Sequence, residues 1–353
     1  MLRFFTVFFF LVSLALFFSV YISPLYFPYV GLVALTIPVL LVINLILLVG
    51  LILARRKLAI LPLLAIIFGW KYVGMTYQIR QNNPDKEGLS VLSYNVHLFS
   101  YSRDGKAENS QNILQWLKEN DSDIKCFQEF YQDPTTPSRN AIKQLGTEKG
   151  YGHSYQIIQG NPKKATYGMA IFSRYPIVND GVVLDSRTTN GIIFADVKVN
   201  KDTIRIYNVH LESMNIPSAE LDNIEGIKEH YRKTLGKLKR GQVSRASQLK
   251  TLFEHMENSP YRNILVGDFN DVPYSYTYMS LRSIMDNAFE MAGRGFGFTY
   301  NKVLFFLRID NIFHDKSLKI KNFETHSEVD YSDHYPISAV FELDEDTIAR
   351  SKD

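Results

Sequence analysis

The chain has 353 residues, of which 46% are hydrophobic and 21% are charged, and this balance excludes a wholly disordered protein. A single cysteine, Cys126, excludes an internal disulfide framework and a multi-cysteine zinc site. The formal net charge of +3 averages two unlike parts, because residues 1–80 hold six basic residues and no acidic residue. Residues 81–353 then hold 33 basic and 36 acidic residues, so a basic, apolar N-terminal part precedes a body of net charge −3.

The N-terminal part contains three apolar runs, at about 4–22, 30–54 and 58–77. A helix needs roughly 20 apolar residues to cross the hydrocarbon core of a bilayer, so the first two runs qualify directly. The third run contains Pro62 and reaches full length only if the Lys71 ammonium extends toward the interface. We therefore expect residues 1–80 to form a multi-pass membrane anchor. A cleaved signal peptide for the first run and an interfacial third run are the alternatives.

The basic residues of the anchor predict its orientation. Arg3 and the cluster at 55–57 flank the apolar runs, whereas the connection at 23–29 carries no charge. Cytoplasmic loops carry an excess of Lys and Arg, so these groups are expected in the cytoplasm. Three spans would then place the rest of the chain outside the cytoplasm. If the third run does not span, the rest of the chain stays in the cytoplasm.

After the anchor, residues 81–88 are polar with one proline and predict a linker, and 346–353 predict a polar tail. Between them, residues 89–345 alternate short apolar strands with amphipathic helices. This pattern predicts one α/β domain in which two sheets pack together. Neither a G-x-G-x-x-G nor a G-x-x-x-x-G-K-[ST] motif is present, so a nucleotide-binding fold has little support.

Many of the predicted strands end in a polar side chain that can bind metal or transfer a proton. These residues are Asn95, Glu129, Asn208, His210, Asp268, Asn270, Asp310, Asp333 and His334. Any one carboxylate could be a structural capping group. Burying a charged side chain inside an apolar run costs about several kcal/mol of folding free energy unless the charge is paired or bound to metal. The repeated pattern therefore favours a functional site.

These residue types suit metal-assisted hydrolysis of phosphoesters. Hard oxygen ligands such as Glu129 and Asp333 favour Mg²⁺ or Mn²⁺ over zinc. An aspartate can activate water, a histidine can donate to phosphate oxygens, and a second aspartate can fix that histidine. Covalent catalysis by a cysteine or serine nucleophile is disfavoured, because Cys126 lies inside a predicted core strand and no G-x-S-x-G motif is present.

Seven stretches of the chain resemble, in order, the motifs of the endonuclease/exonuclease/phosphatase superfamily. They are SYNVH, QEF, YGMAIFSRYPI, NVHLE, GDFND, RIDNIF and SDHYPI, within residues 91–341. The resemblance implies a two-sheet α/β sandwich of the deoxyribonuclease-like type. It also implies hydrolysis of phosphoester bonds with a divalent metal.

The resemblance implies a metal-binding role for three residues. Glu129 would be the principal ligand, Asn95 would assist it, and Asp333 would be a further carboxylate of the metal site. The expected cofactor is Mg²⁺ or Mn²⁺.

The resemblance implies catalytic roles for five more residues. Asp268 would orient or deprotonate the attacking water, and Asn270 would hold the water or the phosphate. His334 would stabilise the transition-state phosphate, with Asp310 paired to it. His210 matches the phosphate-contacting histidine of the phosphatase-like and deoxyribonuclease-like branches.

Two further residues are expected at the substrate, namely Asn208 and Arg174, with a structural role as the alternative for Arg174. His97, two residues after Asn95, is assigned to solvent or packing. The stretch 231–245 carries six basic residues and no acid, which predicts either a solvated helix face or a patch for phosphate-rich substrate or anionic lipid headgroups.

Three functions remain open from the sequence. The first is a membrane-anchored phosphodiesterase or nuclease, and the second is the same chemistry on a phospholipid, sphingomyelin or inositol-phosphate headgroup. The third is a non-catalytic membrane binding protein on this scaffold. The expected partners are the bilayer and a phosphoester substrate, and no protein partner is predicted.

Overall fold

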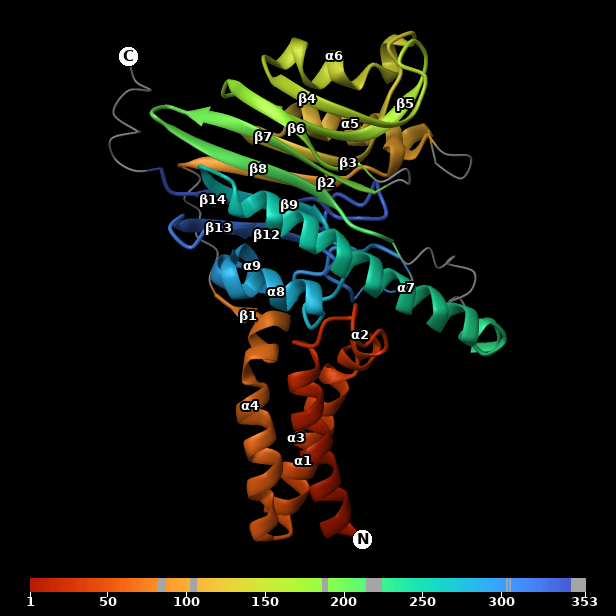
Figure 1. Ribbon diagram of the computed structural model, residues 1–353, viewed down its shortest axis with the longest axis vertical. Coiled ribbons are helices and arrows are strands. Elements are labelled where there is room, and N and C mark those ends of the chain that lie inside the picture. The colour runs from red at the N-terminus through yellow and green to blue at the C-terminus, as the bar shows by residue number, and fades with distance from the viewer. Residues whose placement is uncertain are drawn as a thin grey trace. The chain divides into compact units, whose positions relative to one another are not determined.

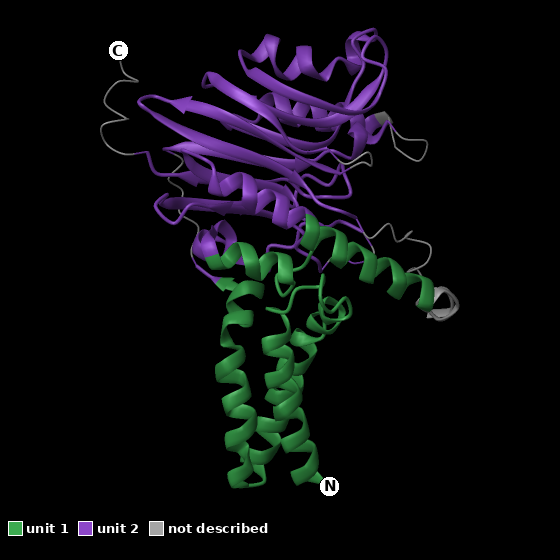
Figure 2. Ribbon diagram, in the orientation of Figure 1, with its two compact units in different colours: residues 1–78, 214–247, 271–283 green, residues 79–213, 248–270, 284–353 purple. Residues whose placement is uncertain are grey.

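The computed structural model describes residues 1–80, 87–101, 107–185, 190–213, 224–302, 304 and 306–343. They form two compact units, which Figure 2 distinguishes by colour. Unit 1 comprises 1–78, 214–247 and 271–283, and unit 2 comprises 79–213, 248–270 and 284–353. Most of the expected linker, 81–86, and the whole expected tail, 346–353, lie outside the described residues.

Unit 1 contains a bundle of three apolar helices that pack on one another (Figure 1). They are α1 (Leu2–Ser19), α3 (Ile37–Leu53) and α4 (Ile60–Thr76), the last preceded by the short helix η1 (Lys57–Ala59). Inside the bundle the Asn44 amide donates to the Ser13 hydroxyl at 2.7 Å, and the Tyr72 hydroxyl donates to the Phe17 carbonyl at 2.6 Å. By length and composition, α1 and residues 57–76 could each cross a membrane, and α3 is a shorter apolar helix.

The expected span over 30–54 is not one helix. The structure has a short helix α2 (Val30–Ala34), a turn at Leu35 and Thr36, and then α3. Pro38 lies in the first turn of α3, where its missing N–H is tolerated, but it disfavours continuation of a helix from the preceding residues. The helical part of this run is therefore 17 residues in α3, near the lower limit for a span.

Unit 1 also includes most of the long helix α7 (Ile224–Glu257) and of α8 (Tyr276–Ile284). The Lys239 ammonium lies 4.6 Å from the centre of the Tyr29 ring, next to α2. The Thr76 hydroxyl, at the end of α4, lies 3.1 Å from the Tyr274 hydroxyl. The basic stretch and the segment before α8 thus pack at the same end of the apolar bundle.

Unit 2 is a sandwich of two six-stranded mixed sheets. The first sheet has the order β10-β12-β9-β8-β7-β6, and the second has the order β13-β14-β2-β3-β5-β4. The strands of the first sheet are β6 (Ile177–Asp185), β7 (Gly191–Val199), β8 (Asp202–His210), β9 (Arg262–Asp268), β10 (Asp286–Asn287) and β12 (Asp310–His314). Those of the second are β2 (Leu89–Asn95), β3 (Ile124–Gln132), β4 (Gly152–Gly160), β5 (Thr166–Ser173), β13 (Ile320–Thr325) and β14 (Ile337–Phe341). The expected two-sheet α/β fold is confirmed.

The remaining elements of the chain are short or lie on the faces of the sheets. The helices are α5 (Ala107–Glu119), α6 (Ala141–Leu145), α9 (Ala288–Ala292), η2 (His97–Ser100), η3 (Pro137–Arg139) and η4 (Thr147–Lys149). The two-residue strands are β1 (Gln78–Ile79) and β11 (Arg294–Gly295). Strand β2 ends at Asn95, because His97 begins a turn of left-handed residues.

The main core of unit 2 lies between the two sheets. Side chains from both inner faces form it, including Val91, Ile171, Ile206 and Val266, and all four are fully buried. A second cluster joins the outer face of the second sheet to α5 and α6. The residues near the ends of β2, β3, β8 and β9 are mostly buried, which gives the firm support that a precisely shaped site requires.

Candidate active site

The polar residues that end four strands meet at one edge of the sandwich. Strands β2 and β3 are parallel, and so are β8 and β9, so each pair ends at one edge of its sheet. Asn95 is the last residue of β2, and His210 pairs with Asp268 at the ends of β8 and β9. Asp310 begins β12 opposite Asp268.

Glu129 enters this group through an irregularity of β3. The pairing of β3 with β5 shifts register between Phe127 and Phe130, and Glu129 has a φ of +50°. Phe127 and Phe130 consequently both face the outer aromatic cluster, although they are three positions apart and would lie on opposite faces of a regular strand. A bulge with a left-handed residue redirects a side chain at a cost in backbone energy, as is frequent next to active sites.

The Asn95 amide joins the two sheets at the centre of the group. Its nitrogen donates to Asp268 Oδ2 at 3.1 Å and lies 3.4 Å from Glu129 Oε1. Its oxygen accepts from the His97 backbone N–H at 3.1 Å. Asn95 and Asp268 are each 1% exposed, so these bonds form away from bulk water.

His334 and Asp310 form a buried pair. His334 Nδ1 lies 2.8 Å from Asp310 Oδ2, and His334 Nε2 lies 3.7 Å from Asp268 Oδ2. Burial lowers the pKa of His334, but the carboxylates of Asp310 and Asp268 raise it more, so its pKa lies well above the ordinary value. The backbone N–H of Asp310 donates to the Thr299 hydroxyl at 3.1 Å, which fixes the start of β12. His334 is thus oriented as a cationic hydrogen-bond donor.

His210 and Asn270 complete the surroundings of Asp268. His210 Nε2 lies 3.7 Å from Asp268 Oδ2 and 3.9 Å from Glu129 Oε1. The Asn270 backbone N–H donates to Asp268 Oδ1 at 2.8 Å, and its side chain donates to the Leu211 carbonyl at 3.0 Å. Asn270 has a φ of +50°, a second left-handed residue at this site.

Asp333 precedes His334 in the sequence and lies beside His97. Its Oδ1 is 3.7 Å from His97 Nδ1 and accepts from the Ser332 hydroxyl at 3.3 Å. Burial raises the pKa of Asp333, but His334, His97 and Lys302 lower it more, so the net shift is downward. Asp333 is therefore an ionised carboxylate beside the His334 pair, with His97 next to it.

The structure brings eight of the ten expected site residues together and excludes two. Asn208 lies between the sheets, and its side chain is occupied by protein partners. Its oxygen accepts from Gln128 Nε2 at 2.6 Å, and its nitrogen donates to the carbonyls of Phe127 and Ala170 at 2.9 and 3.0 Å. Asn208 is fully buried, so it links the sheets instead of contacting substrate.

Arg174, the second residue apart from the group, is placed elsewhere for a topological reason. Strand β5 is antiparallel to β3, so Ser173 pairs with Ile124 at the start of β3, whereas Glu129 lies toward its end. Arg174 follows Ser173 and binds the Asp121 carboxylate at 2.9 Å. The arginine therefore lies at the opposite end of the sheet and has the structural role that was its alternative.

Three residues near the site, Thr299, Tyr300 and His97, were not predicted from the sequence to take part in it. The Tyr300 ring lies 5.4 Å from the His334 ring, and burial together with Asp333 and Asp268 raises its pKa to about 12, so the phenol stays protonated. Thr299 orients Asp310, and His97 contacts Asp333. The stretch FTYN contains no carboxylate or histidine, so only its position before RIDNIF could have drawn attention to it.

The donor set fits a divalent cation that prefers oxygen ligands. Asp268, Asp310 and His334 offer ligand atoms within 4.8 Å of one another. Because Asp310 is bound to His334, the carboxylates best placed for a cation are those of Glu129 and Asp268, which share the Asn95 amide. Carboxylate and amide oxygens are the ligands that Mg²⁺ and Mn²⁺ prefer.

Comparison with known proteins agrees with this geometry. The sequence model of the endonuclease/exonuclease/phosphatase family matches residues 92–334, and a domain of unknown function matches residues 1–76. No curated protein sequence matches the chain.

Three solved structures illustrate the similarity of fold. A family protein from Leptotrichia buccalis is 17% identical, with a TM-score of 0.51, and the match covers 72% of this chain and 100% of that one. The human Nocturnin catalytic domain with bound sulfate anion is 17% identical, with a TM-score of 0.52 and coverage of 72% and 94%. A mannosyl-6-phosphatase from Bacteroides thetaiotaomicron is 18% identical, with a TM-score of 0.50 and coverage of 72% and 100%.

At these identities the solved structures support the fold alone. The family match spans more than half of the chain and contains every residue of the site. The chain belongs to the endonuclease/exonuclease/phosphatase family, whose members hydrolyse phosphoester bonds.

Proposed function

We propose that this protein is a membrane-anchored phosphodiesterase or nuclease that uses a divalent cation, Mg²⁺ or Mn²⁺. The observation that carries the proposal is the convergence of Asn95, Glu129 and Asp268 opposite the His334–Asp310 pair. Acidic groups on one side can hold a cation and a nucleophilic water, and a cationic donor on the other side can stabilise a phosphate.

Each residue has a role that follows from its contacts. Glu129 would hold the cation, with its carboxylate oriented by the Asn95 amide nitrogen, and the cation when bound would neutralise phosphate charge and make water easier to deprotonate. Asp268 accepts hydrogen bonds on both oxygens, from Asn270 N–H and from the Asn95 amide, which orients it to receive the proton of the attacking water. His334 donates to the phosphate, and Asp310 keeps its imidazole in place.

His210 and Asp333 would flank the reacting phosphate. His210 Nε2 faces both Glu129 and Asp268, so it can approach a phosphate oxygen held between them. Asp333 adds negative charge beside His334, which favours the imidazolium form. The sulfate bound to the Nocturnin domain is consistent with a tetrahedral oxyanion site on this fold.

The second candidate is the same chemistry on a lipid or inositol-phosphate headgroup. Its supporting observation is the apolar bundle in unit 1, because an enzyme held at a bilayer meets headgroups at high local concentration. The neighbouring structures include a sugar phosphatase, so fold similarity does not choose between the two substrate classes.

Anchoring in a bilayer is supported by the outer surface of the bundle. Only 22% of α1 and 28% of the span at 57–76 are buried inside the structure, and large apolar side chains such as Phe4, Ile46 and Phe68 are exposed. Apolar surface of this extent does not remain in water in a soluble protein. Lys71 contacts the Tyr21 hydroxyl at 2.7 Å near one end of the bundle, as expected for an interfacial cation.

The proposal is tested with the full chain in detergent or nanodiscs. Hydrolysis of a DNA oligonucleotide, sphingomyelin and an inositol phosphate is measured with Mg²⁺, Mn²⁺ or EDTA. We expect activity on the nucleic acid that EDTA abolishes and that Asp268→Asn and His334→Ala each reduce by at least about a hundredfold. Arg174→Ala, which changes a charge at the far end of the sheet, is the control and should retain activity.

Two results would count against the proposal. Activity that persists in EDTA would exclude the cation, and activity that survives both Asp268→Asn and His334→Ala would exclude this site. Hydrolysis of sphingomyelin or inositol phosphate without hydrolysis of DNA would favour the second candidate.

A further inference from the structure

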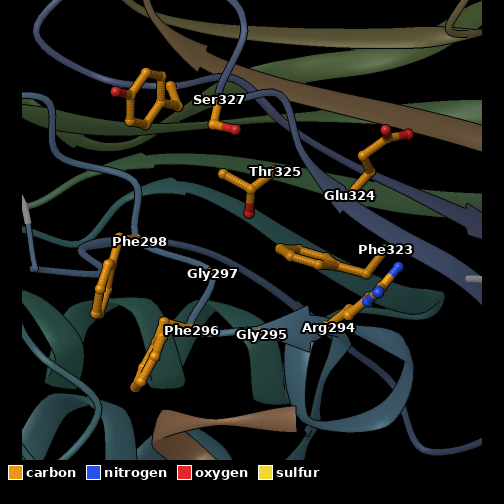
Figure 3. Close-up of a pocket in the computed structure, with 10 residues that line it drawn as sticks. Arg294, Gly295, Phe296, Gly297, Phe298, Phe323, Glu324, Thr325 and Ser327 are labelled. Atoms are coloured by element: carbon orange, nitrogen blue, oxygen red, sulfur yellow. The ribbon is translucent and has the colours of Figure 1, made fainter. Parts of the chain in front are cut away.

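A second cavity lies in unit 2, apart from the carboxylate cluster. It has a volume of about 560 Å³, within the range of small-molecule sites. Its wall is formed by the loop 294–298, the end of β13 with Ser327, and Tyr335 (Figure 3). None of these residues has a part in the proposed catalysis.

Aromatic side chains form much of the cavity wall. The rings of Phe296 and Phe298 stack with centres 5.0 Å apart and an interplanar angle of 17°. Gly295 and Gly297 have φ of +67° and +59°, and these left-handed residues allow two phenylalanines so close in sequence to lie side by side. Phe296 is nevertheless 49% exposed, so its side chain is accessible to an incoming group.

The cavity also contains a polar group without a protein partner. Thr325 Oγ1 is buried and makes no hydrogen bond in the described structure. In Figure 3 this hydroxyl points into the space between Phe298 and Phe323. An unsatisfied buried hydroxyl destabilises the folded chain, so a ligand that bonds to it would recover that free energy. Arg294 and Ser327 supply further donors on the lining.

The cavity is joined to the catalytic residues by the backbone. Phe298 precedes Thr299, whose hydroxyl holds the Asp310 N–H, and Tyr335 follows His334. The Tyr335 backbone N–H donates to the Thr299 carbonyl at 2.7 Å, and Tyr300 forms a bridge to His334. A group bound in the cavity would therefore contact Phe298 and Tyr335, which adjoin the two segments that position the His334–Asp310 pair.

We propose that this cavity binds a nucleobase. A flat ring with polar edges can stack on the Phe296–Phe298 pair and bond to the Thr325 hydroxyl at the same time. An acyl chain would leave that hydroxyl unsatisfied, and an inositol ring has no flat face to stack on phenylalanine. The base belongs either to the substrate or to a separate nucleotide. If it belongs to the substrate, the inference rests on the proposed function and narrows it to nucleic acid or nucleotides.

The first test measures binding directly and does not depend on catalysis. Adenosine, myo-inositol and inorganic phosphate are titrated into the full chain in nanodiscs by calorimetry. Adenosine should bind, and Phe296→Ala should weaken it roughly five- to a hundredfold, the range for loss of one stacking partner. Thr325→Val keeps the side-chain shape and removes only the hydroxyl, and it should weaken adenosine binding several-fold.

Val178→Ala, at a β6 side chain that is 53% exposed, is the matched control and should leave adenosine binding unchanged. Equal binding of adenosine and myo-inositol, or adenosine binding that neither Phe296→Ala nor Thr325→Val weakens, would overturn the proposal. Failure of the proposed function would show itself separately, as absence of phosphodiester hydrolysis by a protein that still binds adenosine.

The second test distinguishes the two sources of the base. If the base is part of the substrate, Phe296→Ala raises KM for a dinucleotide, kcat changes less, and adenosine inhibits competitively. If the base belongs to a separate nucleotide, adenosine changes the rate of dinucleotide hydrolysis without competing, and Phe296→Ala leaves KM unchanged while removing the adenosine effect. Either pattern supports a nucleobase site. A rate that is insensitive both to adenosine and to Phe296→Ala contradicts it.

Discussion

At the scale of single residues, the site depends on side chains whose polar atoms are almost all committed to a partner. Asp268 is the clearest case, because both of its oxygens accept hydrogen bonds and two histidines lie 3.7 Å from Oδ2. Hydrogen bonds to both oxygens hold the Asp268 carboxylate in one orientation before substrate binds. Glu129 differs, since its carboxylate is a quarter exposed and can accept a further ligand.

A substitution of Glu129 should therefore change the affinity for the cation more than the chemical step. Glu129→Gln removes the negative charge but keeps the side-chain size, so the Mg²⁺ concentration for half-maximal activity should rise by about 10- to 100-fold. Activity is measured across a Mg²⁺ titration. Glu254→Gln is the control, because the Glu254 carboxylate is 63% exposed on α7 and pairs with Lys250. An unchanged Mg²⁺ midpoint would show that Glu129 is not a ligand.

Asp310 should act through His334. Asp310→Asn keeps the shape of the side chain but replaces a carboxylate that stabilises the imidazolium, so kcat should fall roughly a hundred- to ten-thousandfold. Thermal unfolding should be measured on the same sample, because loss of activity with an unchanged unfolding temperature assigns the effect to catalysis. A decrease of less than threefold would mean that His334 needs no orienting partner.

At the scale of elements, the close approach of β8 and β9 holds His210 and Asp268 together. Gly267 precedes Asp268 with a φ of +142°, and a Cβ there would lie 1.9 Å from the Val209 carbonyl oxygen. Gly267→Ala should lower stability by about 1–3 kcal/mol or more and reduce activity, since the strands must move apart. Gly152→Ala is the matched control in a strand, because its Cβ would meet only an atom 3.8 Å away. Equal unfolding temperatures for the two variants would contradict the close approach.

A buried lysine under α5 makes stability depend on pH. Lys125 is 2% exposed, and its ammonium donates to the Leu117 and Asn120 carbonyls. Burial, with a smaller effect of Arg174, lowers the pKa of Lys125 from 10.5 to about 8. Between pH 8 and 10.5 the unfolded chain binds more protons than the folded chain, so folding becomes more favourable as pH rises.

Comparison with Lys125→Met isolates this effect from other titrating groups. The free energy of unfolding of the wild type, relative to the variant, should increase by on the order of 3 kcal/mol between pH 7.5 and 10.5. Denaturant unfolding of both proteins at the two pH values measures the difference. A difference that stays constant would mean that Lys125 keeps its ordinary pKa in the folded chain.

The strands that could be predicted from the sequence are those in the interior of the sheets. The apolar runs of β2, β3, β8 and β9 are buried on both faces and therefore stand out as continuous hydrophobic segments. The strands at the sheet edges, β4, β6, β10 and β13, all have partly exposed residues. Their composition is close to that of loops, so single-sequence patterns do not distinguish them.

The same physics explains which of the expected site residues lie together in the structure. A polar residue that ends a buried strand has few explanations other than function, and this argument located Asn95, Asp268 and Asp310. Asn208 and Arg174 lie apart from this group. The Asn208 amide satisfies backbone carbonyls of the facing sheet, and the position of Arg174 depends on strand direction. The bulge that turns Glu129 inward has no signal in its composition.

At the scale of the whole molecule, the structure of unit 1 bears on which side of a membrane the enzyme works. The connection after α1 and the end of α4 both contact later parts of unit 1, through Tyr29 with Lys239 and Thr76 with Tyr274. The cluster Arg55–Lys57 lies between α3 and α4, at the other end of these helices. If the bundle crosses a bilayer, the number of crossings that fits these contacts is three.

Three crossings with Arg55–Lys57 in the cytoplasm predict an extracytoplasmic hydrolase, and reporter fusions test this. In a bacterial host, a reporter that is active only in the periplasm should be active when fused after Arg80 and silent when fused after Lys57. Deletion of 57–77 removes one crossing, so the same reporter fused after Arg80 should become silent, while replacement of 57–77 by an unrelated apolar span should restore it. The replacement separates loss of a crossing from loss of sequence-specific packing. A silent fusion after Arg80 in the intact chain would place the catalytic unit in the cytoplasm and restrict its substrates to those found there.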